Sequence, residues 1–463
     1  MKRFWIGLGA ACVFALCAFG TVWVVRFLTY ARSSRAYLAA GPANLAREQA
    51  AARAAGIPLE AAHLQRPLPP PSQNAAPLYV KLAKLLRNKP LLQPPYAEHM
   101  VATESYTPAQ IAAVRELLVD RSDVTSLAHQ AAARPQCVFV RDWNKGLSLE
   151  FPEYQRMRPA VRLLTAQSYL LARDGHYAQA VANQAQGFRM AEHIASDRIL
   201  LAYLVGNASE AITLSGMQSI LMLAGPNAAV DEDVKRAVTQ SRPHLFLREA
   251  LRDEPAAMAP VFTQLHAGQS RGVAWLDAAM KGLTNGGKMP TPDSSVSAPA
   301  AEQKIVSDTI DGQQANYLAD MRHLIAGMDG PEAARRSAFA AVMNPSAEDM
   351  KTGSRAISFT LMRDPQMLDD DEKRIHAREA VTLAAATLLA ARAKAGAYPD
   401  RLPPGFLDPF SGKPLQYRRE GADGFAVYSV GPTGHFDGGR PGQKPPGAES
   451  LFRYPVVPLP AGV

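Results

Sequence analysis

An uncharged run of 22 residues, Phe4–Val25, constrains this chain more than any other feature of its sequence. It follows Met1-Lys2-Arg3 and is closed by Arg26. As a helix rising about 1.5 Å per residue it would reach roughly 33 Å, enough to cross a hydrocarbon core of about 30 Å. Trp5 and Trp23 stand near its two ends, where amphipathic rings favour the headgroup zone. The run predicts a single transmembrane anchor, with the lipid bilayer as its partner.

A cleaved signal peptide is the main alternative for this run. Its apolar core usually has about 7–15 residues and ends in a small-x-small cleavage site. The run is longer than that, and Leu16-Cys17-Ala18 carries leucine at the first position of the motif. Thr29-Tyr30-Ala31 fits better but lies beyond the apolar run. We therefore expect an anchor that is kept.

The orientation of the anchor is weakly encoded. Lys2, Arg3 and the amino terminus oppose Arg26, Arg32 and Arg35, so the flanking charges nearly cancel. Long domains translocate largely regardless of charge. We expect a bacterial inner-membrane protein whose larger part faces the periplasm or the outside.

The composition beyond the anchor fits a globular protein, since the chain is 47% hydrophobic and 20% charged. Cys137 is the one cysteine outside the apolar run, which excludes an intramolecular disulfide and a cysteine-based zinc site there. We interpret Cys137 as a small buried apolar residue.

Positive charge is concentrated in the first third of the chain. Residues 1–160 hold 19 Lys and Arg against 10 Asp and Glu, a net +9, so the remainder carries −1 of the total +8. The cations are scattered, with no aromatic-interleaved basic motif, and we expect no nucleic-acid partner. Anionic headgroups near the anchor are the alternative partner. Lys81, Lys84 and Arg87 are interpreted as the solvated face of a helix whose apolar side holds Leu78, Leu82 and Leu85.

Helical patterns fill most of the chain after the anchor. Residues 31–64 predict a juxtamembrane helix broken at Gly56-Ile57-Pro58, and 66–71 a stiff Pro-rich linker. Thr107-Pro108 is a typical helix start. Periodic apolar residues predict further helices near 76–88, 107–119, 122–133, 231–239, 245–281 and 316–342.

A helical hairpin is predicted over 159–195, with its turn at Asp174-Gly175. Gly175-His176-Tyr177-Ala178-Gln179-Ala180 resembles the segment between the helices of a tetratricopeptide repeat. No second copy follows at a period of about 34 residues, so one such hairpin is expected and not an array. The apolar stretch 199–224 contains Glu210, which is costly at bilayer depth, and predicts a buried core helix.

The C-terminal part changes from helical to extended patterning. Asp369–Glu372 suit the positive end of a helix dipole, and the helix should run to about Lys394 and stop at Gly396. Residues 415–419 and 425–430, separated by Gly421–Gly424, predict a β-hairpin. At most one further short strand is expected, at Leu451–Tyr454.

Three sequences in this region carry a family resemblance: Gly396-Ala397-Tyr398-Pro399, Leu407–Leu415 and Gly424–Pro432. Their order and spacing resemble the C-terminal minidomain of type II secretion major pseudopilins, over about 375–440. The resemblance implies a small sheet packed on the end of a long helix. The N-terminal run lacks the prepilin-peptidase site of that family, and Gly434–Gly439 offers Asp437 as its single carboxylate, so we expect no calcium site there.

Local motifs for catalysis are missing. Gly282–Lys288 has the spacing of a phosphate-binding loop, but Met289 replaces the required Ser or Thr, and a flexible loop is expected. His193 is interpreted as an exposed or core-satisfied ring. The adjacent acids Asp253 and Glu254 should point in different directions on a helix. We assign no catalytic, cofactor-binding or metal-binding residue, and we expect no cofactor.

The sequence predicts a mainly α protein with an N-terminal transmembrane helix, an all-helical body with αα-hairpins and a small C-terminal antiparallel β element. The function that fits best is a non-enzymatic, membrane-anchored scaffold or interaction protein of the cell envelope, with a protein partner and a role near secretion or pilus machinery. An exported hydrolase with a non-local active site is the alternative. The expected segments are an anchor at 1–28, a juxtamembrane helix and Pro-rich linker at 29–73, a helical domain at 74–282, a loop at 283–303, a helical continuation at 304–368, a pseudopilin-like helix and β-hairpin at 369–440, and a Pro-rich tail at 441–463.

Overall fold

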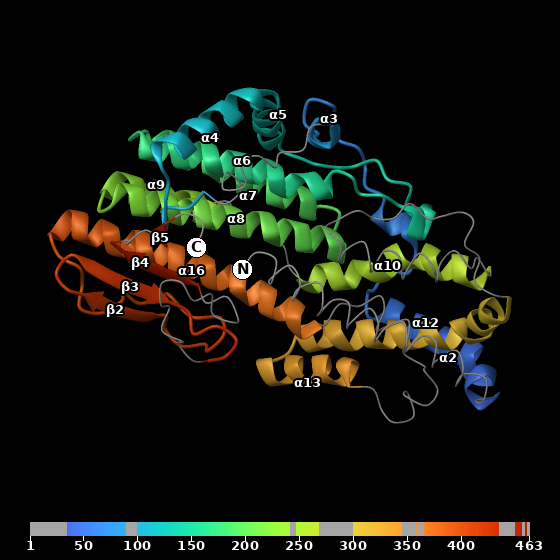
Figure 1. The fold of residues 1–463 in the computed structure, drawn as a ribbon. Helices are drawn as coiled ribbons and strands as arrows, with labels where there is room; N and C mark the ends of the chain where they lie inside the picture. Colours follow the sequence, from blue (N-terminus) through green and yellow to red (C-terminus); the bar gives the residue numbers. More distant parts are fainter. Residues whose placement is uncertain are drawn as a thin grey trace.

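The protein is mainly helical and carries a small antiparallel sheet near its C-terminus (Figure 1). The computed structural model describes residues 35–88, 100–240, 247–267, 300–344, 358, 365–434, 450–455 and 459–460. The run Phe4–Val25 lies outside these residues, so the anchor stays a prediction. No helix among the described residues is long and apolar enough to span a membrane. The helices are α2 (Arg35–Ala54), α3 (Ala76–Asn88), α4 (Pro108–Asp120), α5 (Ser122–Ala132), α6 (Tyr154–Arg173), α7 (Tyr177–Ala195), α8 (Leu200–Ala224), α9 (Ala228–Gln240), α10 (Leu247–His266), α12 (Ala300–Met328), α13 (Glu332–Met343) and α16 (Pro365–Ala395).

Several helices begin or end at the capping and turn residues that the sequence predicts. Thr107 caps α4: its hydroxyl accepts from the Gln110 amide, while the Gln110 side chain accepts from the Thr107 amide. The α6–α7 hairpin turns at Gly175, whose φ of +84° favours glycine. The bounds of α3, α4 and α5 agree with the predicted helices to within one residue.

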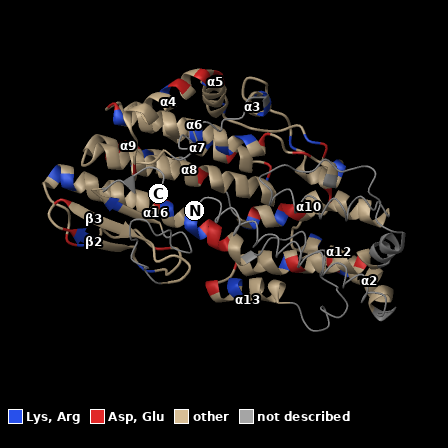
Figure 2. Cartoon of the chain, in the orientation of Figure 1, with Lys and Arg blue, Asp and Glu red and all other residues tan. Residues whose placement is uncertain are grey.

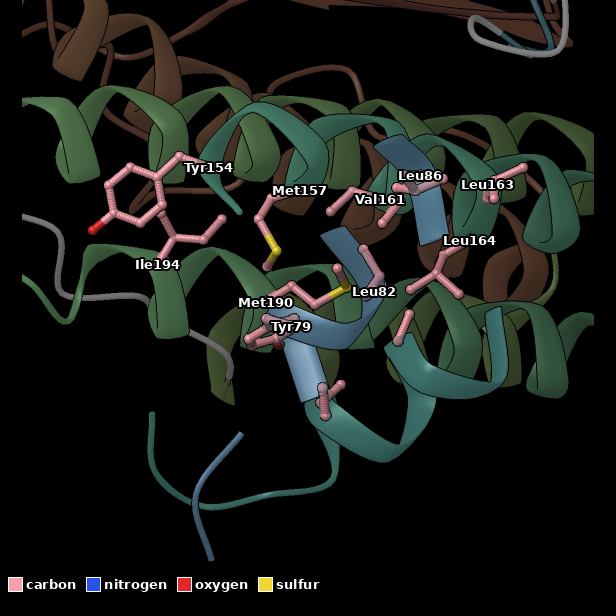
Figure 3. Packing of buried hydrophobic residues seen from close by; sticks show 14 of the residues in the cluster. Tyr79, Leu82, Leu86, Tyr154, Met157, Val161, Leu163, Leu164, Met190 and Ile194 are labelled. Carbon is pink, nitrogen blue, oxygen red and sulfur yellow. The ribbon is translucent and has the colours of Figure 1, made fainter. Parts of the chain in front are cut away.

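Helix α8 lies at the centre of the body, in contact with α6, α7, α9, α10 and α16. Its approach to α7 is close because two glycines stand at the crossing. A β-carbon on Gly187 would overlap Thr213, and one on Gly216 would overlap Gln184. The predicted core helix is therefore confirmed. Its two neighbours α6 and α7 carry the apolar cluster of Figure 3, in which Tyr79 of α3 packs against Met190.

Helix α2 packs along α12, far from it in sequence (Figure 1). A β-carbon on Gly41 would stand 3.3 Å from the amide nitrogen of Gly312, so the two backbones approach closely. Arg322 of α12 also donates to Glu48 at 3.0 Å. The helix predicted before the break at Gly56 thus exists as α2, and it forms one side of a core shared with α10, α12 and α13.

Three predicted segments differ from the structure. The helix expected over 245–281 is α10, which ends at His266. The single helix expected over 316–342 is wrong, because Gly330-Pro331 separates α12 from α13. Proline lacks the amide that would continue a helix, and here it occupies the position just before α13. Helix α12 begins at Ala300, so the end of the loop predicted at 283–303 is helical. The rest of that loop lies outside the described residues.

Helix α16 begins at Pro365, one turn earlier than predicted, and ends before Gly396, whose φ is +74°. The dipole argument for Asp369–Glu372 is wrong, because these acids stand in the second turn. Asp369 is fully buried and pairs with Arg335 at 2.8 Å and Lys373 at 2.8 Å. The other acids also have partners away from a helix end: Asp370 accepts from Gln366 and Asp371 pairs with Arg374 within α16, while Glu372 accepts from the Leu247 amide.

A three-stranded antiparallel sheet follows α16, in the order β2 (Gln416–Glu420), β3 (Gly424–Tyr428) and β4 (Leu451–Tyr454). The predicted hairpin and the extra short strand are both present, with Gly421 at φ +76° in the turn. Strands β3 and β4 contact α16. Their rings Phe425 and Phe452 stack with centroids 5.8 Å apart in the core shared with that helix. A short parallel pairing of β5 (Leu459–Pro460) with β1 (Glu104–Ser105) was not predicted.

Candidate interaction site around Arg141

Two connecting segments run side by side at one edge of the helical body, the Pro-rich stretch before α3 and residues 136–141 after α5. Asn74 and Gln136 form a parallel bridge between them. The Asn74 side chain accepts from the Val138 amide at 2.9 Å and donates to the Val138 carbonyl at 3.0 Å. Arg66 donates to the Cys137 carbonyl at 2.9 Å. The stretch predicted as a linker is therefore bonded to the body.

Residue Arg141, on the second segment, is the centre of a buried charge network. Its Nε lies 2.5 Å from Asp197 Oδ2, and its Nη2 pairs with Glu153. The Tyr154 hydroxyl donates to the same Asp197 oxygen at 2.5 Å. The side chains of Arg141, Glu153 and Asp197 are 5%, 3% and 4% exposed. Such a network holds together because each charge has a partner inside the protein.

Three aromatic rings surround the Arg141 guanidinium. Its central carbon lies 4.6 Å from the ring centroid of Phe139, 4.5 Å from that of Phe151 and 5.0 Å from that of Tyr154. A desolvated cation is attracted to ring faces at this range. Figure 3 shows Tyr154 beside Ile194, at the edge of the apolar cluster. The rings therefore join the charge network to that core.

The network is close to charge balance only when Arg66 is counted. One arginine faces two carboxylates, and Arg66 Nη2 lies 3.9 Å from Asp197 Oδ1. Its side chain is 31% exposed, so it stands at the solvent edge. Although burial opposes the charged form, the facing Tyr154, Asp197 and Glu153 raise the pKa of Arg141 above its usual range. Burial and Asp197 raise the pKa of Tyr154 as well, which keeps its hydroxyl a donor.

Backbone strain marks the turn that supplies Asp197. Arg198, the next residue, has φ of +54°, and among the described residues it is the one non-glycine with a positive φ. This left-handed conformation costs an L-residue about 1–2 kcal/mol. A strained backbone conformation of this kind persists where contacts of the neighbouring residues hold it in place. Asp197, held by Arg141 and Tyr154, supplies those contacts.

Cys137 and His193 lie near this network, and neither is placed as a reactive group. Cys137 is 3% exposed, and burial raises the pKa of its thiol, so it stays protonated and a poor nucleophile. The His193 ring bonds the Tyr79 hydroxyl through Nδ1 at 2.9 Å. Burial and the nearby Arg189 lower the pKa of His193 to about 4, so it is neutral at pH 7. The core-satisfied interpretation of His193 agrees with this geometry.

An exposed valine stands next to the buried arginine. Phe139 and Arg141 are each 7% exposed, whereas Val140 between them is 79% exposed. On the neighbouring segment, Leu68 is 59% exposed, two residues after Arg66. Val140 thus lies between Val138, whose backbone bonds to Asn74, and the buried Arg141, while Leu68 follows Arg66, which donates to the Cys137 carbonyl. We call Val140 and Leu68 the apolar pair.

Other residues discussed from the sequence lie away from this site. Lys81, Lys84 and Arg87 are exposed on α3, while Leu82 faces the core, in agreement with a solvated helix face. Asp253 pairs with Arg252, and Glu254 accepts from the Leu200 amide at 2.7 Å, so these neighbours do point apart. Gly282–Lys288 and Asp437 lie outside the described residues. Among the described residues no group of His, Cys, Asp and Glu could hold a metal ion.

The charge network was not predicted from the sequence. Arg141 is 12 residues from Glu153 and 56 from Asp197, so no local motif joins them. The one signal was the density of aromatic residues between 139 and 154. Comparison with protein-family models, with curated proteins and with solved structures finds no match for this chain.

Proposed function

We propose that this chain is a non-enzymatic interaction protein of the bacterial cell envelope, tethered to the inner membrane by Phe4–Val25. In this proposal the helical body is a scaffold that binds a protein partner through the apolar pair, Val140 and Leu68. The observation that carries it is the contrast at residues 139–141, where an exposed valine stands between two buried side chains.

The physical support is preorganisation. A docking residue contributes most when little conformational entropy is lost on binding. Arg141 is held by Asp197 and Glu153. The Asn74 side chain both donates to and accepts from the backbone of Val138, two residues before Val140. An apolar side chain on such backbone can enter a pocket of a partner without reordering the loop. Arg66, two residues before Leu68, is partly exposed and adds a charge at the edge of this surface. Polar and charged residues of this kind surround the apolar centres of protein interfaces.

The hydrolase alternative receives no support from this cluster. An active nucleophile needs a base beside it or a lowered pKa. Burial raises the pKa of Cys137, and the Ser196 hydroxyl is bonded to the carbonyls of Cys137 and His193 at 2.8 and 2.7 Å. These groups stabilise the α7–α8 turn instead of forming a reactive pair.

Site-specific photocrosslinking in the native envelope tests the proposal. A photoreactive residue is placed at Val140, at Leu68 or, as a control, at Val119. Val119 is 76% exposed and lies near the end of α4, so it matches Val140 in exposure but not in position. We expect one discrete protein adduct from positions 140 and 68 and none from 119. Equal adducts at all three positions, or none at 140, would reject this surface.

A substitution complements the crosslink. Val140→Asp places a charge on the surface without touching the core and should abolish the adduct formed from position 68. The far-ultraviolet circular dichroism and the thermal midpoint should be unchanged. A reporter fused after Val463 separately tests the predicted orientation of the anchor.

A further inference from the structure

The turn between α7 and α8 differs from the other helix ends in the residue that takes its left-handed position. Helices α6, α8 and α16 are each followed closely by a glycine with a positive φ: Gly175 at +84°, Gly225 at +63° and Gly396 at +74°. Glycine is the common choice there because it has no β-carbon. After α7 the first residue with a positive φ is Arg198, at +54°. Among the described residues, a large charged side chain takes such a position only here.

Arg198 has no internal partner for its charge. Its side chain is exposed, and no hydrogen bond or ion pair joins its guanidinium to any residue that the structure describes. Its backbone amide donates to the Ala195 carbonyl at 2.9 Å, a bond that a glycine would make equally well. No bond of the side chain therefore offsets the strain of the backbone. A strained residue kept without such a bond indicates a role of its side chain at the surface.

The acids near Arg198 are already paired. Arg141 and Arg66 together balance the two buried carboxylates of the network. On α7 the exposed Glu192 pairs with Arg189 at 2.6 Å. Figure 2 shows residues of both charge signs on α6 and α7, the helices that lead into this edge of the body. Arg198 is therefore a positive charge in excess.

A buried ion pair fixes Arg198 relative to the apolar pair. Asp197, directly before Arg198, accepts from Arg141 at 2.5 Å, and Val140 directly precedes Arg141. The two exposed residues are thus each the chain neighbour of one member of that bond. Their backbones cannot move apart without breaking a buried ion pair, which is costly.

The segment of Leu68 is joined to the same turn through Arg66. Nη2 of Arg66 lies 3.0 Å from Oγ of Ser196, which is two residues before Arg198, and Leu68 is two residues after Arg66. The exposed Asp142 borders this surface, and its carboxylate accepts from a backbone amide of its own segment at 3.3 Å. Three segments therefore present two apolar side chains and a cation that no described acid neutralises.

We propose that Arg198 binds a carboxylate of the protein partner, so that the partner presents an acidic residue beside the apolar group that docks on Val140 and Leu68. This ion pair rests on the proposed function, since it presupposes a partner on the apolar pair, and it adds the chemistry of that partner. A guanidinium binds a carboxylate through two parallel N–H donors. Arginine is also enriched among the residues that contribute most to protein binding. A glycine would relieve the turn but would leave the partner's carboxylate without its cation.

Photocrosslinking from position 140 in isolated envelope membranes tests this ion pair. In Arg198→Gly we expect the adduct yield to fall about tenfold, the effect of losing one charge-assisted bond. The thermal midpoint of the same variant, measured on the full chain in detergent, should rise because the strain is relieved. Arg198→Lys keeps the charge and should retain most of the adduct. A lower adduct yield together with a lower thermal midpoint would assign Arg198 a structural role and overturn the proposal.

Arg189→Gln is the matched control, because it removes an exposed arginine of α7 that is already paired with Glu192. It should leave the adduct unchanged. Added salt should weaken the native adduct but not the residual adduct of Arg198→Gly, since salt screens exposed ion pairs. An unchanged adduct in Arg198→Gly, or an equal loss in Arg189→Gln, would overturn the ion pair and leave the apolar pair as the docking surface. No adduct from the native chain would instead reject the proposed function itself.

Discussion

The amide nitrogen of the Gln184 side chain, on α7, occupies the space that a β-carbon on Gly216 of α8 would need. Gln184 is 1% exposed and bridges the bundle there. It donates to the Thr213 carbonyl at 3.0 Å and to the Thr165 hydroxyl at 3.2 Å. The Gln184 side chain therefore links α7 to both α6 and α8. It can do so only because residue 216 is a glycine and leaves room for it.

Gly216→Ala should therefore destabilise the protein. Gln184 would have to leave its place and lose buried hydrogen bonds, and overpacking of a core costs about 1–3 kcal/mol. Urea denaturation at equilibrium measures the change in the free energy of unfolding. The double variant Gly216→Ala with Gln184→Ala relieves the overlap, so the two effects should be clearly non-additive. If the two substitutions changed the free energy of unfolding additively, the contact between Gln184 and position 216 would not limit the residue at 216.

Arg141→Met should be among the most damaging single substitutions in the chain. It leaves Glu153 and Asp197 buried without their main cation, a loss that costs about 3–5 kcal/mol for a buried pair. Thermal and chemical unfolding report it. Adding Glu153→Gln and Asp197→Asn should restore part of the stability, because the uncompensated charges are gone. Failure of the triple variant to recover any stability would place the role of Arg141 in its aromatic contacts.

Arg198→Gly should stabilise the protein by about 1 kcal/mol, since glycine adopts a positive φ without the strain of a β-carbon. The measurement is the shift of the unfolding midpoint. Arg189→Gly is the matched control, an exposed arginine inside α7. There glycine should destabilise by about 1 kcal/mol, because it is a poor helix former. If both variants shifted the unfolding midpoint in the same direction, the backbone strain at Arg198 would be contradicted.

Asp231→Asn should change the pH dependence of stability at the α9–α16 contact. Asp231 is fully buried on α9, and burial raises its pKa from 3.8 to about 7. Its raised pKa means that stability is present below pH 3.8 and lost as pH rises through about 7. The variant should be more stable than the native chain above pH 7 and should lack this part of the decline. Thermal unfolding across that range checks it.

Local chemistry in the sequence predicted much of the secondary structure. Thr107-Pro108 begins α4, Asp174-Gly175 turns the α6–α7 hairpin, and Gly421 turns the β-hairpin, because each acts within a few residues of itself. The long apolar stretch 199–224, with Glu210 in its middle, likewise predicted α8 as a core helix. The assignment of Asp369–Glu372 to a helix end failed, since an acid satisfied by a distant arginine has the same local pattern as one that favours a helix dipole.

The sequence by itself determined a mainly helical body, its hairpins and a small C-terminal sheet, since capping, periodicity and glycine turns are short-range effects. Only the tertiary structure decided that α2 lies on α12, that Arg141 meets Asp197, and that Arg378 of α16 bonds to the Ala211 carbonyl of α8. Each of these contacts joins positions more than fifty residues apart. Their energies come from burial and from charges brought together by folding, and neither quantity exists in the pattern of one segment.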